Sequence, residues 1–103
     1  MFGEMASTGL RDQDRLEGAS NYFIWKARAS FLLDYHDLKT YIVSVVVEPR
    51  NANQLKAYKK EMAKAKRQIL DEVRDHVVSH IAGKGTTKEM WDALATLYQG
   101  SFE

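Results

Sequence analysis

Residues 16–33 read LEGASNYFIWKARASFLL, and this stretch decides the fold. Gly18 to Ser20 break the chain, and Ser20 or Asn21 can cap a helix because a short side-chain oxygen accepts a hydrogen bond from a first-turn amide. The residues that follow predict a helix to about Tyr35, since apolar side chains recur at helical spacing. They form two neighbouring stripes, which are Tyr22, Trp25, Ala29, Leu32 and Leu33 in the first and Ile24, Phe31 and Tyr35 in the second. We expect a helix this apolar to be buried against several partners.

Phe23 does not fit either stripe, because it lies on the polar side of this helix, with Lys26, Ser30 and Asp34. Another segment of the chain, such as the N-terminal arm, could cover its ring. Alternatively, Phe23 is an anchor in a protein–protein contact, where exposed aromatic residues concentrate binding energy. Both interpretations stay open, and Phe23 is a candidate interface residue.

The composition is that of one ordinary globular domain, with 103 residues, 45% hydrophobic and 28% charged. Residues 1–15 are small, polar and charged, and we expect them to form a flexible arm before a helical domain of residues 16–103. The chain has no cysteine, which excludes a disulfide scaffold, thiolate catalysis and a Cys-based zinc knuckle within it. It has no long apolar run and no signal-peptide pattern, so we expect a cytoplasmic protein that does not contact a membrane.

Residues 38–47 are ambiguous. Their β-branched residues favour a strand, but the chain has no second strand-like run with which such a strand could pair. Because Leu38, Tyr41, Ile42 and Val45 also keep helical spacing, we predict a helix, capped by Asp37 and ended by Pro49.

Three further helices are predicted in the rest of the chain. A long amphipathic helix starts at Gln54 after a capping loop at residues 51–53, and it bends or breaks near residues 71–75. A short helix then runs to about Ile81. Thr86 and Glu89 form a capping box for the last helix, which Gly100 ends. The sequence therefore predicts an all-α bundle of about five helices.

The long helix carries a concentration of positive charge. Residues 50–67 contain seven Lys or Arg and a single acid, Glu61. Candidate phosphate contacts on its polar face are Lys56, Lys60, Lys64 and Arg67. The ordinary interpretation is a solvated face; the other is weak, salt-sensitive contact with nucleic acid that does not read sequence.

Glu72, His76 and His80 follow each other at four-residue intervals and would share a face on a continuous helix. Two His at this spacing can bind zinc. The flanking sequence offers no further ligand, so we interpret these His as partly buried or capping residues and predict no metal and no cofactor. Residues 83–86 lack the leading glycine and preceding strand of a phosphate loop, and no serine lies in a nucleophile turn. We therefore do not expect an enzyme.

Two motifs resemble a known family. Residues 16–22 with Trp25 resemble the N-terminal Gag segment of copia-type LTR retrotransposons, which opens with Leu, Gly, Asn-Tyr and Trp in this order. Residues 86–94 with Tyr98 resemble that family's later signature of Thr, Lys-Glu, Trp-Asp, Leu and Tyr. The resemblance covers about residues 16–98. The chain departs from the family pattern at Thr87, where the family frequently has Ala, and in the valine-rich residues 42–47.

The resemblance implies a capsid-forming Gag domain that associates with itself into virus-like particles around the element's RNA. The residues that match family motif positions are expected to specify the fold as cap and core; they are Gly18, Asn21, Tyr22, Trp25, Trp91, Leu94 and Tyr98. The partner expected first is a second copy of the chain, then a host protein, with weak RNA contact. Two alternatives stay open, namely a domesticated adaptor module that keeps the Gag fold and a helical domain that binds nucleic acid through Lys56–Arg67.

Overall fold

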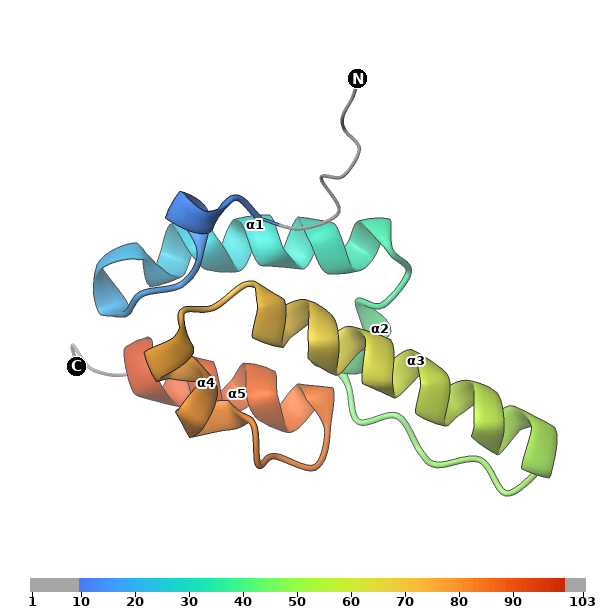
Figure 1. The fold of residues 1–103 in the computed structure, drawn as a ribbon. Coiled ribbons are helices and arrows are strands. Elements are labelled where there is room, and N and C mark those ends of the chain that lie inside the picture. Colours follow the sequence, from blue (N-terminus) through green and yellow to red (C-terminus); the bar gives the residue numbers. More distant parts are fainter. Residues whose placement is uncertain (1–9, 100–103) are drawn as a thin grey trace.

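The computed structural model describes residues 10–99, which fold into α-helices joined by short segments, as Figure 1 shows. No strand occurs among these residues, so the prediction of an all-α bundle of about five helices is confirmed. In chain order the elements are the short 3₁₀ turns η1 (Asp12–Asp14) and η2 (Ala19–Asn21) and the helices α1 (Tyr22–Tyr35), α2 (Thr40–Val43), α3 (Ala52–Asp71), α4 (Asp75–Ile81) and α5 (Thr87–Tyr98).

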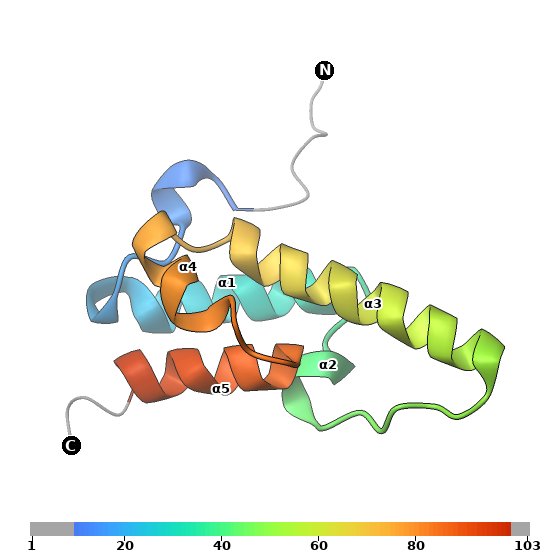
Figure 2. The same cartoon turned by 60° about the horizontal axis from the view of Figure 1, so that its bottom comes forward.

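The last helix, α5, lies at the centre of the packing. It contacts α2, α3 and α4, and α1 packs against α3. Figures 1 and 2 both show the first half of α3 extending beyond the other helices. The buried core accordingly takes side chains from α3 only in its second half, where Ala65 and Ile69 are fully buried. The other core residues are Leu16, Tyr22, Trp25, Ala29, Leu33, Leu38, Ile42, Val73, Val77, Ile81, Met90 and Leu94.

The start of α1 differs from the prediction in its capping. The helix begins after Asn21 as expected, but neither Asn21 nor another side chain caps it. Asn21 instead fixes the preceding turn, accepting from the amides of Glu17 and Gly18 at 3.0 and 3.4 Å and donating to the carbonyl of Arg15 at 2.9 Å. The 3₁₀ turn η2 runs directly into α1, so the Tyr22 amide already has the Ala19 carbonyl as its acceptor.

Asp37 has its role at the end of α1. The prediction that Asp37 caps the next helix is wrong, because that helix starts only at Thr40 and has no side-chain cap. Asp37 has a positive φ of 61° and ends α1 instead. The Asp37 amide donates to the Asp34 carbonyl at 3.0 Å and the Leu38 amide to the Leu33 carbonyl at 2.7 Å. This pair of hydrogen bonds is a Schellman motif.

The predicted helix over residues 38–47 is wrong in its second half. Only Thr40–Val43 are helical, and Ser44 has the extended dihedrals φ −150° and ψ 161°. The following residues Val45–Val47 form no helix. Their β-branched side chains lose rotamer freedom in a helix, and here that local preference prevails.

The break after α3 is where the sequence predicts it. Asn51 caps α3, accepting from the amides of Asn53 and Gln54 at 2.9 and 3.2 Å, and the helix ends at Asp71. Val73 then forms a parallel bridge with Leu16. The Leu16 amide donates to the Glu72 carbonyl, and the Arg74 amide donates to the Leu16 carbonyl, both at 3.0 Å. The N-terminal segment thus ties down the loop between α3 and α4.

The capping box of α5 is confirmed. The Glu89 amide donates to Thr86 Oγ1 at 3.1 Å, and Glu89 Oε1 accepts from the amides of Gly85 and Thr86 at 2.9 and 3.3 Å. The predicted stop at Gly100 lies outside the described residues.

The predicted N-terminal arm lies partly within the described chain. Residues 1–9 lie outside it. Asp12 and Asp14 form ion pairs of 3.1 Å with Arg74 and Arg28, which connect η1 to the start of α4 and to α1.

Candidate functional site

The two sequence motifs meet inside the molecule. The rings of Trp25 and Trp91 lie 5.5 Å apart between centroids, and those of Tyr22 and Tyr98 lie 6.0 Å apart. Tyr22 and Trp25 are buried, as is Leu94 of the second motif. A Cβ at Gly18 would lie 3.9 Å from the Tyr98 ring, so the first motif also begins beside the second. The motif residues therefore pack α1 against α5, and their role in the structure is to hold the fold together.

The outer face of α1 is apolar and exposed. The expectation that this helix is buried is confirmed for most of its first stripe and is wrong for its second, because Ile24, Phe31 and Tyr35 are 55%, 76% and 79% exposed. At 100° per residue these three side chains lie roughly opposite the buried face formed by Tyr22 and Ala29. Figure 1 shows the reason, since α1 lies at one edge of the molecule with the other helices on one side of it. Clustered exposed apolar side chains mark interaction sites.

Phe23 lies between this outer face and the core. Its side chain is half exposed, and its ring meets that of Tyr22 edge to face with 5.4 Å between centroids. The Tyr22 ring, from the same helix, covers part of the Phe23 ring, and 55% of the side chain is exposed, so both interpretations of Phe23 stay predictions.

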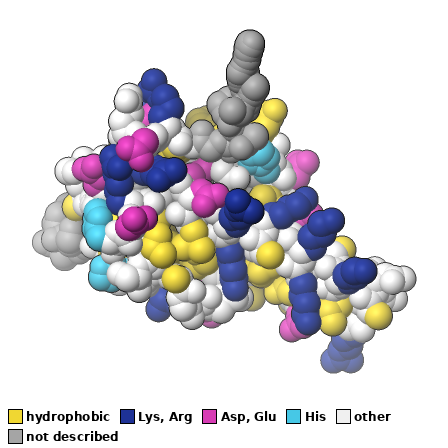
Figure 3. Space-filling view, viewed as in Figure 1, with side chains coloured by type: hydrophobic (Ala, Val, Ile, Leu, Met, Phe, Trp, Pro, Cys, Tyr) yellow, Lys and Arg dark blue, Asp and Glu magenta, His cyan; other side chains and the backbone are white. Residues whose placement is uncertain are grey.

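The predicted basic residues lie together along α3. Lys56, Lys60, Lys64 and Arg67 are all exposed. Figure 3 shows Lys and Arg side chains spread over the part of the surface that α3 forms. Lys64 pairs with Glu61 at 3.6 Å and Arg67 with Asp71 at 3.5 Å, so acids on the same helix offset part of this charge.

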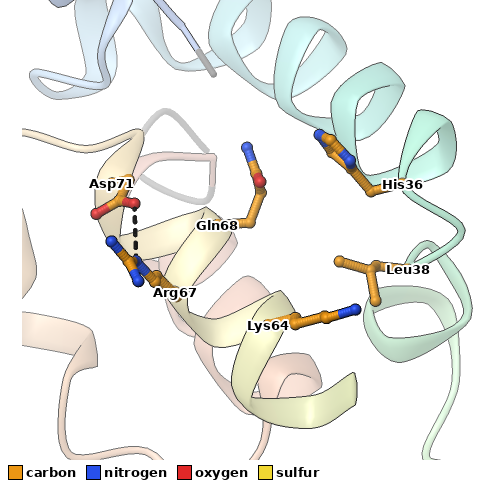
Figure 4. A pocket seen from close by; sticks show the side chains of 6 residues that line it. All are labelled: His36, Leu38, Lys64, Arg67, Gln68 and Asp71. Atoms are coloured by element: carbon orange, nitrogen blue, oxygen red, sulfur yellow. Dashed lines mark ion pairs between the residues drawn. The ribbon is translucent and has the colours of Figure 1, made fainter. Parts of the chain in front are cut away.

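A shallow groove lies between the end of α1, the start of α2 and the second half of α3. Its volume is about 360 Å³, and its lining residues are His36, Leu38, Lys64, Arg67, Gln68 and Asp71. Figure 4 shows Arg67 turned toward Asp71, its partner in the ion pair, and Lys64 reaching toward Leu38. Two of the four predicted basic residues thus face a groove. Both basic and acidic side chains line this groove.

Glu72 is a buried acid that the sequence interpretation misplaced. It follows the last residue of α3 and is fully buried, whereas the sequence groups it with His76 and His80 on one helix face. Burial raises its pKa from about 4.5 to about 7; nearby Asp71 adds to this rise, and the hydrogen bond from Gln68 to Oε2 opposes it. Oε1 has no hydrogen-bond partner among residues 10–99. Its spacing from Ala65 and Ile69 on the buried stripe is the signal that could have located it.

The two histidines do not share a helix with Glu72. His76 and His80 lie exposed on α4, after the break, and His76 Nε2 is 2.7 Å from the Glu17 carbonyl oxygen. Within the described part of the chain, no three His, Cys, Asp or Glu side chains are grouped so that they could hold a metal ion.

Comparison with protein-family models, with curated proteins and with solved structures gives no match for this chain. Among the described helices, none combines the length and the apolar composition that crossing a membrane needs.

Proposed function

We propose that this chain is a structural Gag-type capsid domain of a copia-type retrotransposon, which assembles in the cytoplasm by contacts between copies of itself. The resemblance of the two motifs supports the family. The observation that carries self-association is the outer face of α1, where Ile24, Phe31 and Tyr35 form an exposed apolar stripe. Burying one such side chain contributes about 1.5–3 kcal/mol, so a symmetric contact using three from each copy has enough apolar surface to hold.

The basic side chains of α1 already have partners within one copy. Arg28 pairs with Asp14 at 3.1 Å, and Lys26 Nζ donates to Gln99 Oε1 at 3.3 Å. These charges therefore do not set the orientation of a second copy, and the exposed apolar stripe alone carries the proposed contact.

Sedimentation velocity over a range from micromolar to millimolar protein tests this proposal. We expect concentration-dependent dimers or larger species that Ile24→Gln/Phe31→Gln abolishes while helical circular dichroism is retained. Leu97→Gln, which removes an exposed apolar side chain from α5, is the matched control and should leave the oligomers intact. A strictly monomeric protein at millimolar concentration would contradict self-association, and capture of one stoichiometric host protein would then favour the adaptor module.

Nucleic-acid binding is the second candidate, because Lys56, Lys60, Lys64 and Arg67 lie exposed along a helix that extends beyond the bundle. Phosphate contacts of this kind weaken steeply as salt rises. Lys56→Glu/Lys60→Glu/Lys64→Glu should therefore abolish binding to single-stranded RNA at low salt, and Lys84→Glu, on the turn before α5, is the control. If the triple variant binds RNA as the parent does, this candidate is wrong.

A further inference from the structure

Residues 44–48 form a strand-like segment that lacks a partner strand. The segment leaves α2 at Ser44, which has extended dihedrals, and reaches Pro49. No hydrogen bond joins the backbone of Val45, Val46 or Val47 to any residue in the range 10–99. Across the three valines exposure alternates as in a strand, because Val45 and Val47 are 77% and 83% exposed and Val46 is half-buried.

An unpaired extended segment of β-branched residues is a template for pairing with another chain. We propose that residues 44–48 pair antiparallel with the same residues of a second copy, across a two-fold axis at Val46. This inference rests on the proposed self-association and adds a second contact to it.

The two ends of the extended segment determine where the two-fold axis lies. The helix α2 ends at Val43 on one side, and Pro49, which has no N–H to donate, ends any ladder on the other. The five residues between them are centred on Val46. Antiparallel pairing about that residue sets Val45 of each copy opposite Val47 of the other, so the exposed valines cover one another as β-branched cross-strand pairs.

Charge complementarity favours a second copy over a foreign strand. The same register sets Glu48 of one copy opposite Ser44 of the other. Ser44 and Lys88 line the same small cavity, so Glu48 approaches the ion pair that Lys88 forms with Asp92 at 2.6 Å, and Lys88 is the cation that the two carboxylates can share. Because of the two-fold symmetry, the contact between Glu48 of one copy and Lys88 of the other occurs twice. A strand from another protein would not supply both of these contacts.

The two contacts use different parts of the surface. Figure 1 shows α1 at one edge of the molecule and the segment between α2 and α3 at the opposite edge. A chain with two separate two-fold contacts can link copies into an extended array, whereas one two-fold contact stops at a dimer.

Cysteine cross-linking tests the pairing directly, because the chain contains no cysteine. Residues opposite one another in an antiparallel pair have Cα atoms about 4.5–5.5 Å apart, within the range that a disulfide spans. Val46→Cys should therefore give disulfide dimers under mild oxidation in severalfold higher yield than Val45→Cys. Random collision would give the reverse order, since Val45 is the more exposed. Both variants are checked for wild-type helical circular dichroism.

A mixture of Val45→Cys and Val47→Cys chains provides a second measurement if Val46→Cys does not fold. These residues face one another in the register, so the mixed dimer should exceed either homodimer severalfold. Oligomers that depend on Phe31, together with a Val46→Cys yield no higher than that of Val45→Cys, would overturn the strand pairing and leave the proposed function intact. Absence of oligomers and of disulfide dimers would overturn both.

Discussion

The indole N–H of Trp25 donates a 2.8 Å hydrogen bond to the backbone carbonyl of Glu72, which lies in the loop between α3 and α4. The Leu16 amide donates to the same carbonyl at 3.0 Å. One buried oxygen therefore holds together α1, the segment before it and the break in the second half of the chain. Trp25 belongs to the first motif, so this hydrogen bond gives the motif tryptophan a role in the fold beyond filling space.

Trp25→Phe should lower the free energy of unfolding by about 2–3 kcal/mol. The change removes one donor from a buried carbonyl and leaves a cavity beside Trp91. Urea denaturation measures the loss. Trp91→Phe is the control, because Trp91 is only half-buried and its indole makes no hydrogen bond with residues 10–99. Equal losses in the two variants would contradict the role given to the hydrogen bond.

Asp37→Gly should stabilise the protein by about 0.5–1 kcal/mol. Asp37 has a φ of 61°, in the left-handed region that costs an L-residue energy and glycine almost none. Thermal unfolding followed by circular dichroism measures the gain. Ala27→Gly, at an exposed position in the middle of the same helix, should instead destabilise by about 1 kcal/mol because glycine is less favourable than alanine in a helix interior. A loss of stability in Asp37→Gly would show that the aspartate side chain has a role of its own at this position.

The elements with strong local signals could be predicted from the sequence. The extent of α1, the break after α3 and the capping box at Thr86 and Glu89 depend on residues close in the chain, and all three are present in the structure. The valine segment could not be placed, because two local preferences disagreed there and the absence of a partner strand was taken as evidence for a helix.

The candidate site was harder to predict than the fold, for a physical reason. Apolar periodicity shows which faces of a helix avoid water but does not show whether a neighbour covers each one. The stripe of Ile24, Phe31 and Tyr35 was therefore assigned to the core, although α1 lies at the edge of the molecule. Glu72 was missed for a different reason, since its four-residue spacing grouped it with His76 and His80, and the break between α3 and α4 removes it from their face.

Thr86→Ala should cost about 1 kcal/mol, because it removes the acceptor for the Glu89 amide at the start of α5. Urea denaturation measures this cost. Thr86→Ser keeps the hydroxyl and should retain most of the stability. Thr96→Ala, at an exposed position of the same helix, tests whether the effect comes from the cap rather than from the loss of any threonine. A Thr86→Ser variant as unstable as Thr86→Ala would argue against the capping role.

Glu72 should make the stability of the protein fall as pH rises. Burial raises its pKa to about 7, so between about pH 4.5 and 7 the folded chain holds a proton that the unfolded chain has lost. The free energy of unfolding therefore decreases over this window by about 3 kcal/mol in total. Above about pH 7 Glu72 is ionised in both states, so it adds little further change. Urea denaturation at a series of pH values measures the decrease.

Glu72→Gln tests the assignment, because an amide of nearly the same shape cannot ionise. We expect the variant to match the wild type near pH 4, to exceed it by up to about 3 kcal/mol at pH 8 and to lose the decrease between these values. Glu48→Gln, at an exposed position, should keep the wild-type decrease. If Glu72→Gln instead loses stability at pH 8, the ionised carboxylate makes a favourable contact in the folded protein, and the neutral acid is not its resting form.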